Sequence, residues 1–501
     1  MQFLVGIFVF SMVVALCVTP FVARAAKSWG LVDKPDERRK IHKSATPLSA
    51  AIPLLLPLTL TSIIAFNFSN PYSEVMAHQH RFTTGLLLAA YIIAFIGILD
   101  DRFGLRGRQK LLGQMLAIGI LMSVGGLVVE RISLFGHNFA LGEFLAIPFT
   151  AFWLLGAVNA FNLIDGIDGL ATSVGIIISG ALGGMAIMNG HGEFAMFALT
   201  LSGALCGFLV FNFPPARMFL GDAGSMLIGL ILGGLAIRSS LKGPATAALV
   251  VPTAIWALPI FDVSIAILRR KLTGRSLYET DHGHLHHCLM RRSQSGRRAL
   301  AIAGLLCLLT AAGALTSVHM ENDLMACVSA IVMMLILVVS KSFGHTELNM
   351  LFNRLRKLGS SILLRSRRQD LPESDQLLTR FQGSREWETL WDMLTSFGSR
   401  FELDLIELNV NLPAIGEEYH AKWTSHRHVD FIRQWRSEMP LVVHGRTVGS
   451  LRVSGPINDG SVCEWMGDLI SGLRPFERQM EELVQESYAV RETAIATDVA
   501  G

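Results

Sequence analysis

The chain has 501 residues, of which 51% are hydrophobic, and its mean hydropathy is +0.46. This composition excludes an ordinary soluble protein of this length and predicts a polytopic α-helical membrane protein. The formal net charge of +3 is too small to indicate a nucleic-acid partner, and we expect none. The six cysteines show no paired metal or redox spacing, so we interpret them as packing residues.

Apolar segments of about 20 residues, the length that crosses a bilayer, recur along the first part of the chain. The first runs from Met1 to about Val22 with no basic residue before it, which predicts a retained span rather than a cleaved signal peptide. The predicted transmembrane helices number about eleven and lie near residues 1–22, 48–66, 83–100, 111–129, 143–161, 171–189, 194–211, 223–238, 245–268, 299–317 and 323–340.

Basic residues are distributed unevenly among the loops between these spans. The segment Arg24 to Lys43 carries seven Lys or Arg and the segment Arg102 to Lys110 carries four, whereas residues 189–193 carry none. The positive-inside rule therefore places the basic loops in the cytoplasm and the N-terminus outside. The long basic loop 269–298 falls on the cytoplasmic side by the same count.

Four polar clusters then fall on the predicted cytoplasmic face. They are Asp100-Asp101 after the third span, Asn159, Asn162, Asp165 and Asp168 around the end of the fifth, Asp222 at the start of the eighth, and His284, His286 and His287 in the basic loop. Ionisable groups next to a bilayer span indicate a functional site. Dense oxygen ligands suit Mg²⁺, with Mn²⁺ as an alternative.

Two structural alternatives remain for these clusters. The stretch 159–170 is also typical of a polar helix cap followed by an Asp-Gly turn. The histidines could form a zinc site with Cys288, or a solvated patch.

After Lys341 the composition becomes that of a soluble protein. We predict a transmembrane domain over 1–340, an amphipathic helix or linker over 341–375, with its basic stretch at 351–368, and a cytoplasmic accessory α+β domain over 376–501. Within that domain, helical spacing marks 385–397 and 463–484, and strands are expected at 403–410, around Trp423 and at 440–453.

The clusters contain what is needed to transfer a sugar phosphate from a nucleotide to a lipid phosphate: a metal site, cations and positioning groups. Asp222 begins a helix, where backbone amides face anionic oxygens. Lys110, with Arg106 and Arg108, can attract a phosphate headgroup, and the histidines lie near Arg269, Arg270 and Lys271 as donors for a pyrophosphate.

In this order, four motifs resemble those of the polyprenyl-phosphate N-acetylhexosamine 1-phosphate transferases of glycosyltransferase family 4. They are Asp100-Asp101, Asn159-x-x-Asn162-x-x-Asp165-Gly-x-Asp168-Gly-Leu, Phe219-Leu-Gly-Asp222-Ala-Gly-Ser and His284-Leu-His-His287. The histidine motif resembles the WecA type more than the MraY type. The segment from Val32 to Asp36, with Arg39, Lys40 and His42, adds to the resemblance, which covers about residues 1–340.

The resemblance implies transfer of N-acetylglucosamine 1-phosphate, or a related N-acetylhexosamine 1-phosphate, from a UDP-sugar to undecaprenyl phosphate. UMP would be released, and the product would be the lipid-linked first sugar of a cell-surface glycan. The implied location is the bacterial inner membrane with a cytoplasmic active site, and the implied partners are the UDP-sugar, undecaprenyl phosphate, the lipid bilayer and, by analogy, a second copy in a homodimer.

The resemblance also implies residue roles. Asp222 and Asn162 would bind Mg²⁺, Asp100 and Asp101 would lie at the phosphate and metal site with one as a base, and Lys110 would contact phosphate. Asp165 would support the site, Asp168 would face uracil, and the nucleotide sugar would be held by Asn159, Arg270, His284, His286 and His287. Because a phosphate monoester is already largely dianionic at neutral pH, the attack can also proceed without a general base, in which case these aspartates would position the metal and the lipid.

The chain departs from the family pattern at two places. Leu48-Ser49-Ala50-Ala51 stands where the family usually has a Gly-Gly pair, and the C-terminal domain is an addition to the typical short enzymes. Two other function classes are considered. A cation-coupled transporter would place its charges at mid-bilayer between broken helices, and a membrane-anchored sensor would act through its C-terminal domain.

Overall fold

The computed structural model describes most of the chain, which divides into two compact units. The described residues are 1–33, 46–48, 50–243, 246–273, 283–293, 295–349, 351–352, 377–379, 385–401, 403–412, 417–425, 434–443, 446–456, 476 and 478–481. The first unit comprises 1–35, 41–271 and 276–347, and the second comprises 36–40, 272–275 and 348–501. The segment with Arg39, Lys40 and His42, most of the stretch 351–368 and most of the predicted helix 463–484 lie outside the described residues.

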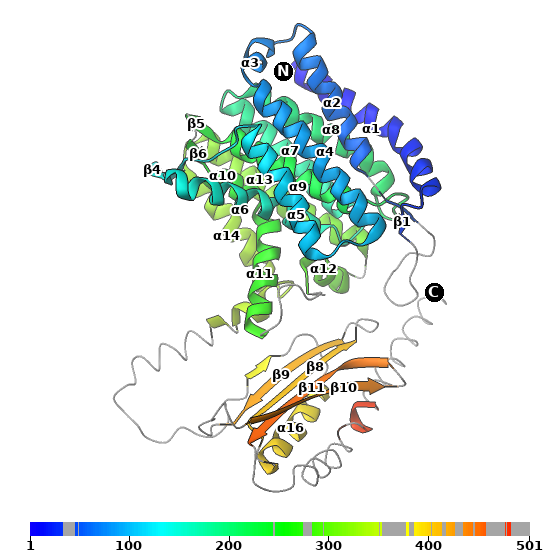
Figure 1. Cartoon of the computed structure of the whole chain (residues 1–501). Coiled ribbons are helices and arrows are strands. Elements are labelled where there is room, and N and C mark those ends of the chain that lie inside the picture. Colours follow the sequence, from blue (N-terminus) through cyan, green and yellow to red (C-terminus); the bar gives the residue numbers. More distant parts are fainter. Residues whose placement is uncertain are drawn as a thin grey trace. The chain divides into compact units, whose positions relative to one another are not determined.

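The first unit is a bundle of helices (Figure 1). They are α1 Gln2–Ser28, α2 Ala51–Asn67, α3 Ser73–His78, α4 His80–Phe103, α5 Gly107–Ser123, α6 Gly142–Ile164, α7 Leu170–Met188, α8 Gly192–Asn212, α9 Gly221–Ser239, α10 Val250–Ile255, α11 Ala257–Thr273, α12 Leu285–Ser293, α13 Gly296–His319 and α14 Asp323–Val339.

Among the described residues, seven helices are long and apolar enough to cross a membrane, namely α1, α4, α6, α7, α8, α9 and α13. Each corresponds to a predicted span, and the chain is a multi-pass membrane protein. The other four predicted spans fall on helices of 17 residues or fewer, which are α2, α5, α10 with α11, and α14. The count of eleven is therefore not confirmed.

The predicted span 245–268 is wrong as a single helix. It begins in a strand, continues as the short α10, and restarts as α11 after Trp256. Pro259 has no backbone N–H to donate to the carbonyl of Ile255, so regular helical hydrogen bonding is interrupted there. Hydropathy alone does not detect this break, because the residues on both sides are equally apolar.

Helix α9 is the most buried of the seven candidate spans, and α4 and α6 pack against it. Glycines allow this close approach. A Cβ added at Gly97 of α4 would lie 2.3 Å from Cα of Ala223, and one at Gly229 of α9 would lie 2.6 Å from the carbonyl oxygen of Ala157. Small residues permit such contacts between membrane helices. The close packing brings the polar ends of these helices together.

Short strands join the helices at both ends of the bundle. β1 (Val32–Asp33) pairs with β2 (Thr46–Pro47) in antiparallel register. A second sheet has the order β4-β3-β6-β5, in which β3 and β6 are parallel and the other pairs antiparallel. Its strands are β3 Arg131–Leu134, β4 His137–Ala140, β5 Leu241–Gly243 and β6 Thr246–Ala248.

The β2 segment fixes the start of α9. The backbone N–H of Phe219 donates to the carbonyl oxygen of Pro47 at 3.0 Å, and that of Ala50 donates to Leu220 at 3.2 Å. Ala50 is fully buried, and a Cβ added at Gly224 would lie 3.1 Å from the Ala50 Cβ. Ala50 and Ala51 stand in the segment where the motif usually has a Gly-Gly pair. Gly224 of α9, which faces Ala50, leaves the space for the alanine side chain.

The second unit contains a five-stranded antiparallel sheet of order β10-β11-β8-β9-β7. Alternate residues of β8, Ile406, Leu408 and Val410, share a core with Leu390 and Trp391 of α16. The predicted elements at 385–397, 403–410, around Trp423 and at 440–453 overlap α16, β8, β9, β10 and β11, whereas β7 is not predicted from the sequence. The domain boundaries at 340 and 375 stay predictions. The elements are β7 Leu377–Thr379, α16 Arg385–Arg400, β8 Leu405–Leu412, β9 Glu417–Thr424, β10 Gln434–Val443 and β11 Arg446–Pro456.

Candidate active site at the ends of four helices

One lysine joins side chains from four helices. The Nζ atom of Lys110 on α5 lies 2.8 Å from Oδ2 of Asp100 on α4 and 2.9 Å from Oδ2 of Asp222 on α9. It also donates to Oδ1 of Asn162 on α6 at 3.1 Å. Three predicted site residues, each from a separate motif, therefore meet around the ammonium group of Lys110.

The local backbone explains these positions. Asp100 lies in the last turn of α4, and its Oδ1 accepts the backbone N–H of Leu105 at 2.8 Å, across the turn formed by Gly104 at φ +64°. Lys110 follows in the first turn of α5. Only 8% of the Asp100 side chain and 18% of the Lys110 side chain are exposed. The Asp100 charge is therefore compensated by Lys110, and the Lys110 charge by Asp100 and Asp222 together.

Asp101 supports the start of α9. Its Oδ1 accepts the backbone N–H of Asp222 at 2.8 Å, and its Oδ2 accepts that of Ala223 at 3.2 Å. Gly221 adopts φ +71°, and a Cβ there would lie 2.7 Å from the Asp101 carboxylate. The amides that the sequence predicts to face an anionic ligand are thus bound to Asp101, which caps the helix as an N-terminal carboxylate does.

The two asparagines of α6 have different neighbours. Nδ2 of Asn162 donates to Asp222, and to Oγ of Ser225 at 3.0 Å. Nδ2 of Asn159 donates to Oε1 of Gln114 at 3.1 Å and to the carbonyl oxygen of Leu155 at 2.9 Å. Asn159 therefore lies one turn from the Lys110 group, between α5 and α6, and its substrate contact stays a prediction.

The turn between α6 and α7 carries the other two predicted aspartates. Oδ2 of Asp168 accepts the backbone N–H of Ala216 at 2.9 Å, which fastens the turn to the segment before α9. Asp165 is the C-cap residue of α6. Loss of hydration, with repulsion by the carboxylates of Asp222 and Asp101, raises the pKa of Asp165 well above its usual range.

The histidine motif lies beside this turn. A Cβ added at Gly166 would lie 2.1 Å from Nε2 of His286, so the imidazole contacts the backbone between the two aspartates. The ring centroids of His286 and His287 are 4.2 Å apart. The structure therefore brings the motif of the basic loop to the turn of α6 and α7, although the two are more than a hundred residues apart in sequence.

His284 is turned toward a carboxylate that the sequence does not single out. Its Nδ1 lies 3.1 Å from Oδ2 of Asp262 on α11, and Oδ1 of Asp262 accepts the backbone N–H of Leu285 at 2.7 Å. Both side chains are buried. Because Asp262 contacts the ring and the next amide together, it fixes the orientation of His284 at the start of α12.

Arg269 and Arg270 at the end of α11 are not equivalent. Arg269 is buried, and its Nε donates to Oε1 of Glu347 at 2.6 Å. Its expected role as a pyrophosphate donor is therefore not supported by its position. Arg270 is partly exposed in the last turn of α11, and its contact with the nucleotide sugar stays a prediction.

The residues around Lys110 fit a hard cation. Carboxylate oxygens of Asp100 and Asp222 and the amide oxygen of Asn162 converge on one positive charge. Within the described part of the chain, no three His, Cys, Asp or Glu side chains form a metal site by themselves, zinc included. Mg²⁺ needs only one or two protein oxygens when phosphate and water complete its octahedron.

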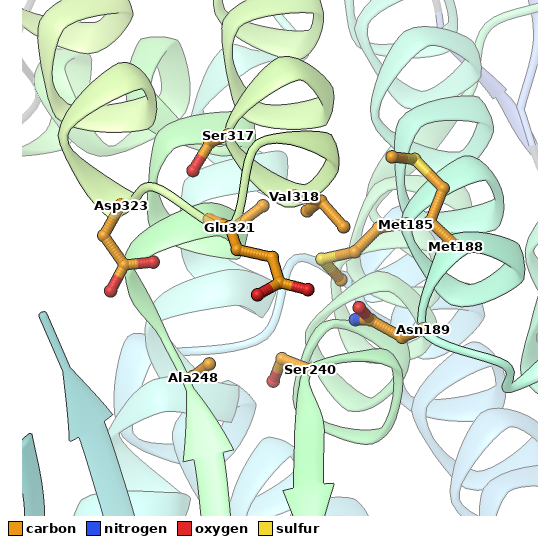
Figure 2. A pocket seen from close by; sticks show the side chains of 10 residues that line it. Met185, Met188, Asn189, Ser240, Ala248, Ser317, Val318, Glu321 and Asp323 are labelled. Atoms are coloured by element: carbon orange, nitrogen blue, oxygen red, sulfur yellow. The ribbon is translucent and has the colours of Figure 1, made fainter. Parts of the chain in front are cut away.

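A cavity of about 380 Å³ lies at the other end of the bundle (Figure 2). Met188 and Asn189, at the end of α7, line it together with Glu321. Helix α7 begins beside Asp168 and, at 1.5 Å per residue, is about 27 Å long. The cavity at its far end therefore lies about that distance from Asp168. It is separate from the carboxylates around Lys110.

The family model of Glycosyl transferase family 4 matches residues 83–240, which include the residues around Lys110 and the α6–α7 turn. The probable undecaprenyl-phosphate N-acetylglucosaminyl 1-phosphate transferase of Bacillus subtilis (strain 168) is 33% identical over 301 residues, or 60% of this chain and 80% of that protein.

Two further relatives differ in the substrate that their names state. The decaprenyl-phosphate N-acetylglucosaminephosphotransferase of Mycolicibacterium smegmatis is 30% identical over 66% of this chain and 85% of its own length. The phospho-N-acetylmuramoyl-pentapeptide-transferase of Moorella thermoacetica is 31% identical over 56% of this chain and 87% of its own length. Similarity of this degree therefore extends to proteins named for different sugars.

Proposed function

This chain belongs to glycosyl transferase family 4, and we propose that it transfers N-acetylglucosamine 1-phosphate from UDP-N-acetylglucosamine to undecaprenyl phosphate, releasing UMP. The observation that carries the proposal is the convergence of Asp100, Lys110, Asn162 and Asp222 at the ends of four helices. An oxygen of the lipid phosphate would attack the β-phosphorus of the UDP-sugar, and the bond from that phosphorus to the oxygen of UMP would break.

The residues around Lys110 would position the reacting phosphates. Lys110 supplies positive charge to the lipid phosphate, and Asp100 orients the lysine through the 2.8 Å ion pair. Asp222 and Asn162 would hold Mg²⁺, or Mn²⁺ in its place. When bound, the ion neutralises charge on the diphosphate and makes UMP a better leaving group. Asp101 keeps Asp222 in place through the backbone of α9.

The turn between α6 and α7 would bind the nucleotide sugar. Asp168 is held by the backbone of Ala216, and His286 contacts Gly166 of the same turn. Arg270, His284 and His287 would complete the pocket, with His284 oriented by Asp262. We assign the uracil to Asp168 and the diphosphate to the basic side chains.

N-Acetylglucosamine is proposed as the sugar because the Bacillus subtilis and Mycolicibacterium smegmatis relatives are named for it. The basic loops support a cytoplasmic active site in a bacterial plasma membrane, where the product would begin a cell-surface glycan. Asp100, Lys110 and Asp222 lie at helix ends rather than at helix centres, which argues against a transporter with mid-bilayer charges.

The test is UMP release by purified, detergent-solubilised protein from UDP-N-acetylglucosamine, with and without undecaprenyl phosphate and with Mg²⁺ or a chelator. We expect UMP only when both lipid and metal are present. Substitution of other N-acetylated UDP-sugars then compares kcat/KM among sugars. Folded protein that releases no UMP from any of them would refute the proposal.

A further inference from the structure

A buried ion pair connects α11, the helix that precedes the histidine motif, to the helical residues 345–349 that follow α14. Nε of Arg269 lies 2.6 Å from Oε1 of Glu347, and 8% and 2% of the two side chains are exposed. Oε2 of Glu347 also accepts the hydroxyl of Thr346 at 2.8 Å. Charges buried to this extent fix the relative positions of the segments that carry them, because separating them removes a direct partner of opposite charge from each.

Arg269 also contacts the chain just before the histidines. A Cβ added at Gly283 would lie 1.9 Å from Nη1 of Arg269, so the guanidinium packs directly against that backbone. His284 follows, and its ring is held by Asp262 on the same helix as Arg269. A side chain at position 283 would therefore require the Arg269 guanidinium to move, so the positions of Arg269 and of the backbone before His284 depend on each other.

From these contacts we propose that Glu347 is a positioning residue for the nucleotide-sugar side of the active site. By holding Arg269 against Gly283, it sets the distance between His286 and the turn at Gly166. The inference rests on the proposed function for the identity of the substrate, but not for the contact itself. Glu347 is the last residue of the first unit, and the polypeptide enters the second unit at the next residue, Leu348.

The position of Glu347 gives the proposal a specific kinetic signature. The pair lies next to the histidine motif, whereas Lys110 is fixed separately by Asp100 and Asp222. Loss of the pair should therefore raise KM for the UDP-sugar about ten-fold and leave KM for undecaprenyl phosphate within about two-fold. A merely structural residue would lower the amount of folded enzyme without separating the two KM values.

The variants are Glu347→Gln and Glu347→Asp in the full-length protein. The first removes the charge and keeps the shape, and the second keeps the charge but shortens the side chain by one methylene. Glu193→Gln is the matched control, since Glu193 is a buried carboxylate of α8 that lies 3.6 Å from His191. Arg269→Gln and Arg269→Gln/Glu347→Gln complete a double-mutant cycle, in which the double variant should be no worse than Glu347→Gln.

Hydrogen exchange of the peptide 283–293, followed by mass spectrometry without substrate, gives a readout that does not need activity. We expect exchange at the start of α12 to rise about ten-fold in Glu347→Gln, less in Glu347→Asp and not in Glu193→Gln. Unchanged exchange and unchanged KM in folded Glu347 variants would overturn the proposal. If the wild type releases no UMP, the proposed function fails while the exchange result still decides whether Glu347 positions the motif.

Discussion

Lys110 carries one positive charge and faces the carboxylates of Asp100 and Asp222, so these three groups together have a formal charge of −1 when all are ionised. Asp101 and Asp165 lie close enough to Asp222 for their charges to interact. A site with excess negative charge repels a diphosphate. This argues that the phosphates bind only after a divalent cation has offset the charge.

Asp222→Asn is expected to lower UMP release by about 10² to 10³-fold, because it removes the carboxylate that faces both Lys110 and the proposed cation. The measurement is kcat/KM at saturating and at limiting Mg²⁺. Asp323→Asn is the control, since Asp323 accepts the backbone N–H of Phe135 near the opposite end of the bundle. Equal losses in both variants would mean that the effect is general destabilisation.

Asp165→Asn tests the raised pKa of Asp165. The folded state binds this proton more tightly than the unfolded chain, in which the pKa of an aspartate is about 3.9. Stability from the protonated carboxyl is present below that value and is lost as pH rises through the raised pKa of the folded state. Asparagine cannot ionise, so the gain in melting temperature over wild type should be larger at pH 8 than at pH 5.

The measurement is thermal unfolding of both proteins in detergent with a chelator at each pH. Added Mg²⁺ should reduce the difference at pH 8, because a cation offsets the repulsion that raises the pKa of Asp165. A difference in melting temperature that is the same at both pH values would contradict the assignment of the shift to this carboxyl.

At the residue scale, the sequence identifies residues that form motifs. It does not identify residues whose partners are brought to them only by folding. Asp100, Asn162 and Asp222 are predicted from their motifs and Lys110 from its basic loop and the family resemblance. The structure brings all four together. Asp262 and Glu347 pair with residues 22 and 78 positions away. An acidic residue within the apolar part of a helix is a signal for Asp262, but nothing local identifies its partner.

Helix packing decides whether the motifs meet. Gly97 lies one turn before Asp100 on α4, and its Cα faces the backbone of Ala223, next to Asp222. A side chain at this position would separate the two helices and lengthen the distances from Lys110 to both carboxylates. The glycine is therefore part of the active site although it carries no functional group.

Gly97→Ala should lower kcat/KM at least about ten-fold and decrease the melting temperature, because a methyl group has no space beside the backbone of α9. Gly156→Ala in α6 is the matched control, since its Cβ would meet nothing within 4 Å. We expect that control to keep activity within about two-fold. Wild-type activity in Gly97→Ala, measured by UMP release, would show that α4 can move without affecting the site.

At the element scale, apolar length predicts the seven long helices, because burial in lipid requires about 20 apolar residues. It does not predict where such a stretch breaks. The interruption between α10 and α11 depends on the missing N–H of Pro259. The first turn of α5 contains Arg108 and Lys110, which shorten the apolar part of that helix. The number of residues in a helix is thus set by local hydrogen bonding as well as by hydropathy.

At the scale of the whole molecule, the residues of the candidate site belong to the first unit. The relatives from Bacillus subtilis and Mycolicibacterium smegmatis match 60% and 66% of the chain, so at least a third of it lies outside each match. Alternation and helical spacing predicted positions within α16, β8, β9, β10 and β11, but not β7. The sequence could not predict a role for the second unit, because recognition surfaces have no local periodicity comparable to that of a strand or helix.

Two truncations distinguish the chemistry of the first unit from the effect of Glu347. A chain ending after Arg368 keeps Glu347 and the residues around Lys110, so it should retain UMP release within about two-fold of the full-length protein. A chain ending after Phe343 lacks Glu347, leaves Arg269 buried without that carboxylate, and should show about a ten-fold higher KM for the UDP-sugar. Both are assayed after size-exclusion chromatography confirms folded protein. Loss of activity in the longer truncation would mean that the second unit is needed for catalysis itself, whereas equal activity in the two would mean that the segment after Phe343 does not position the histidine motif.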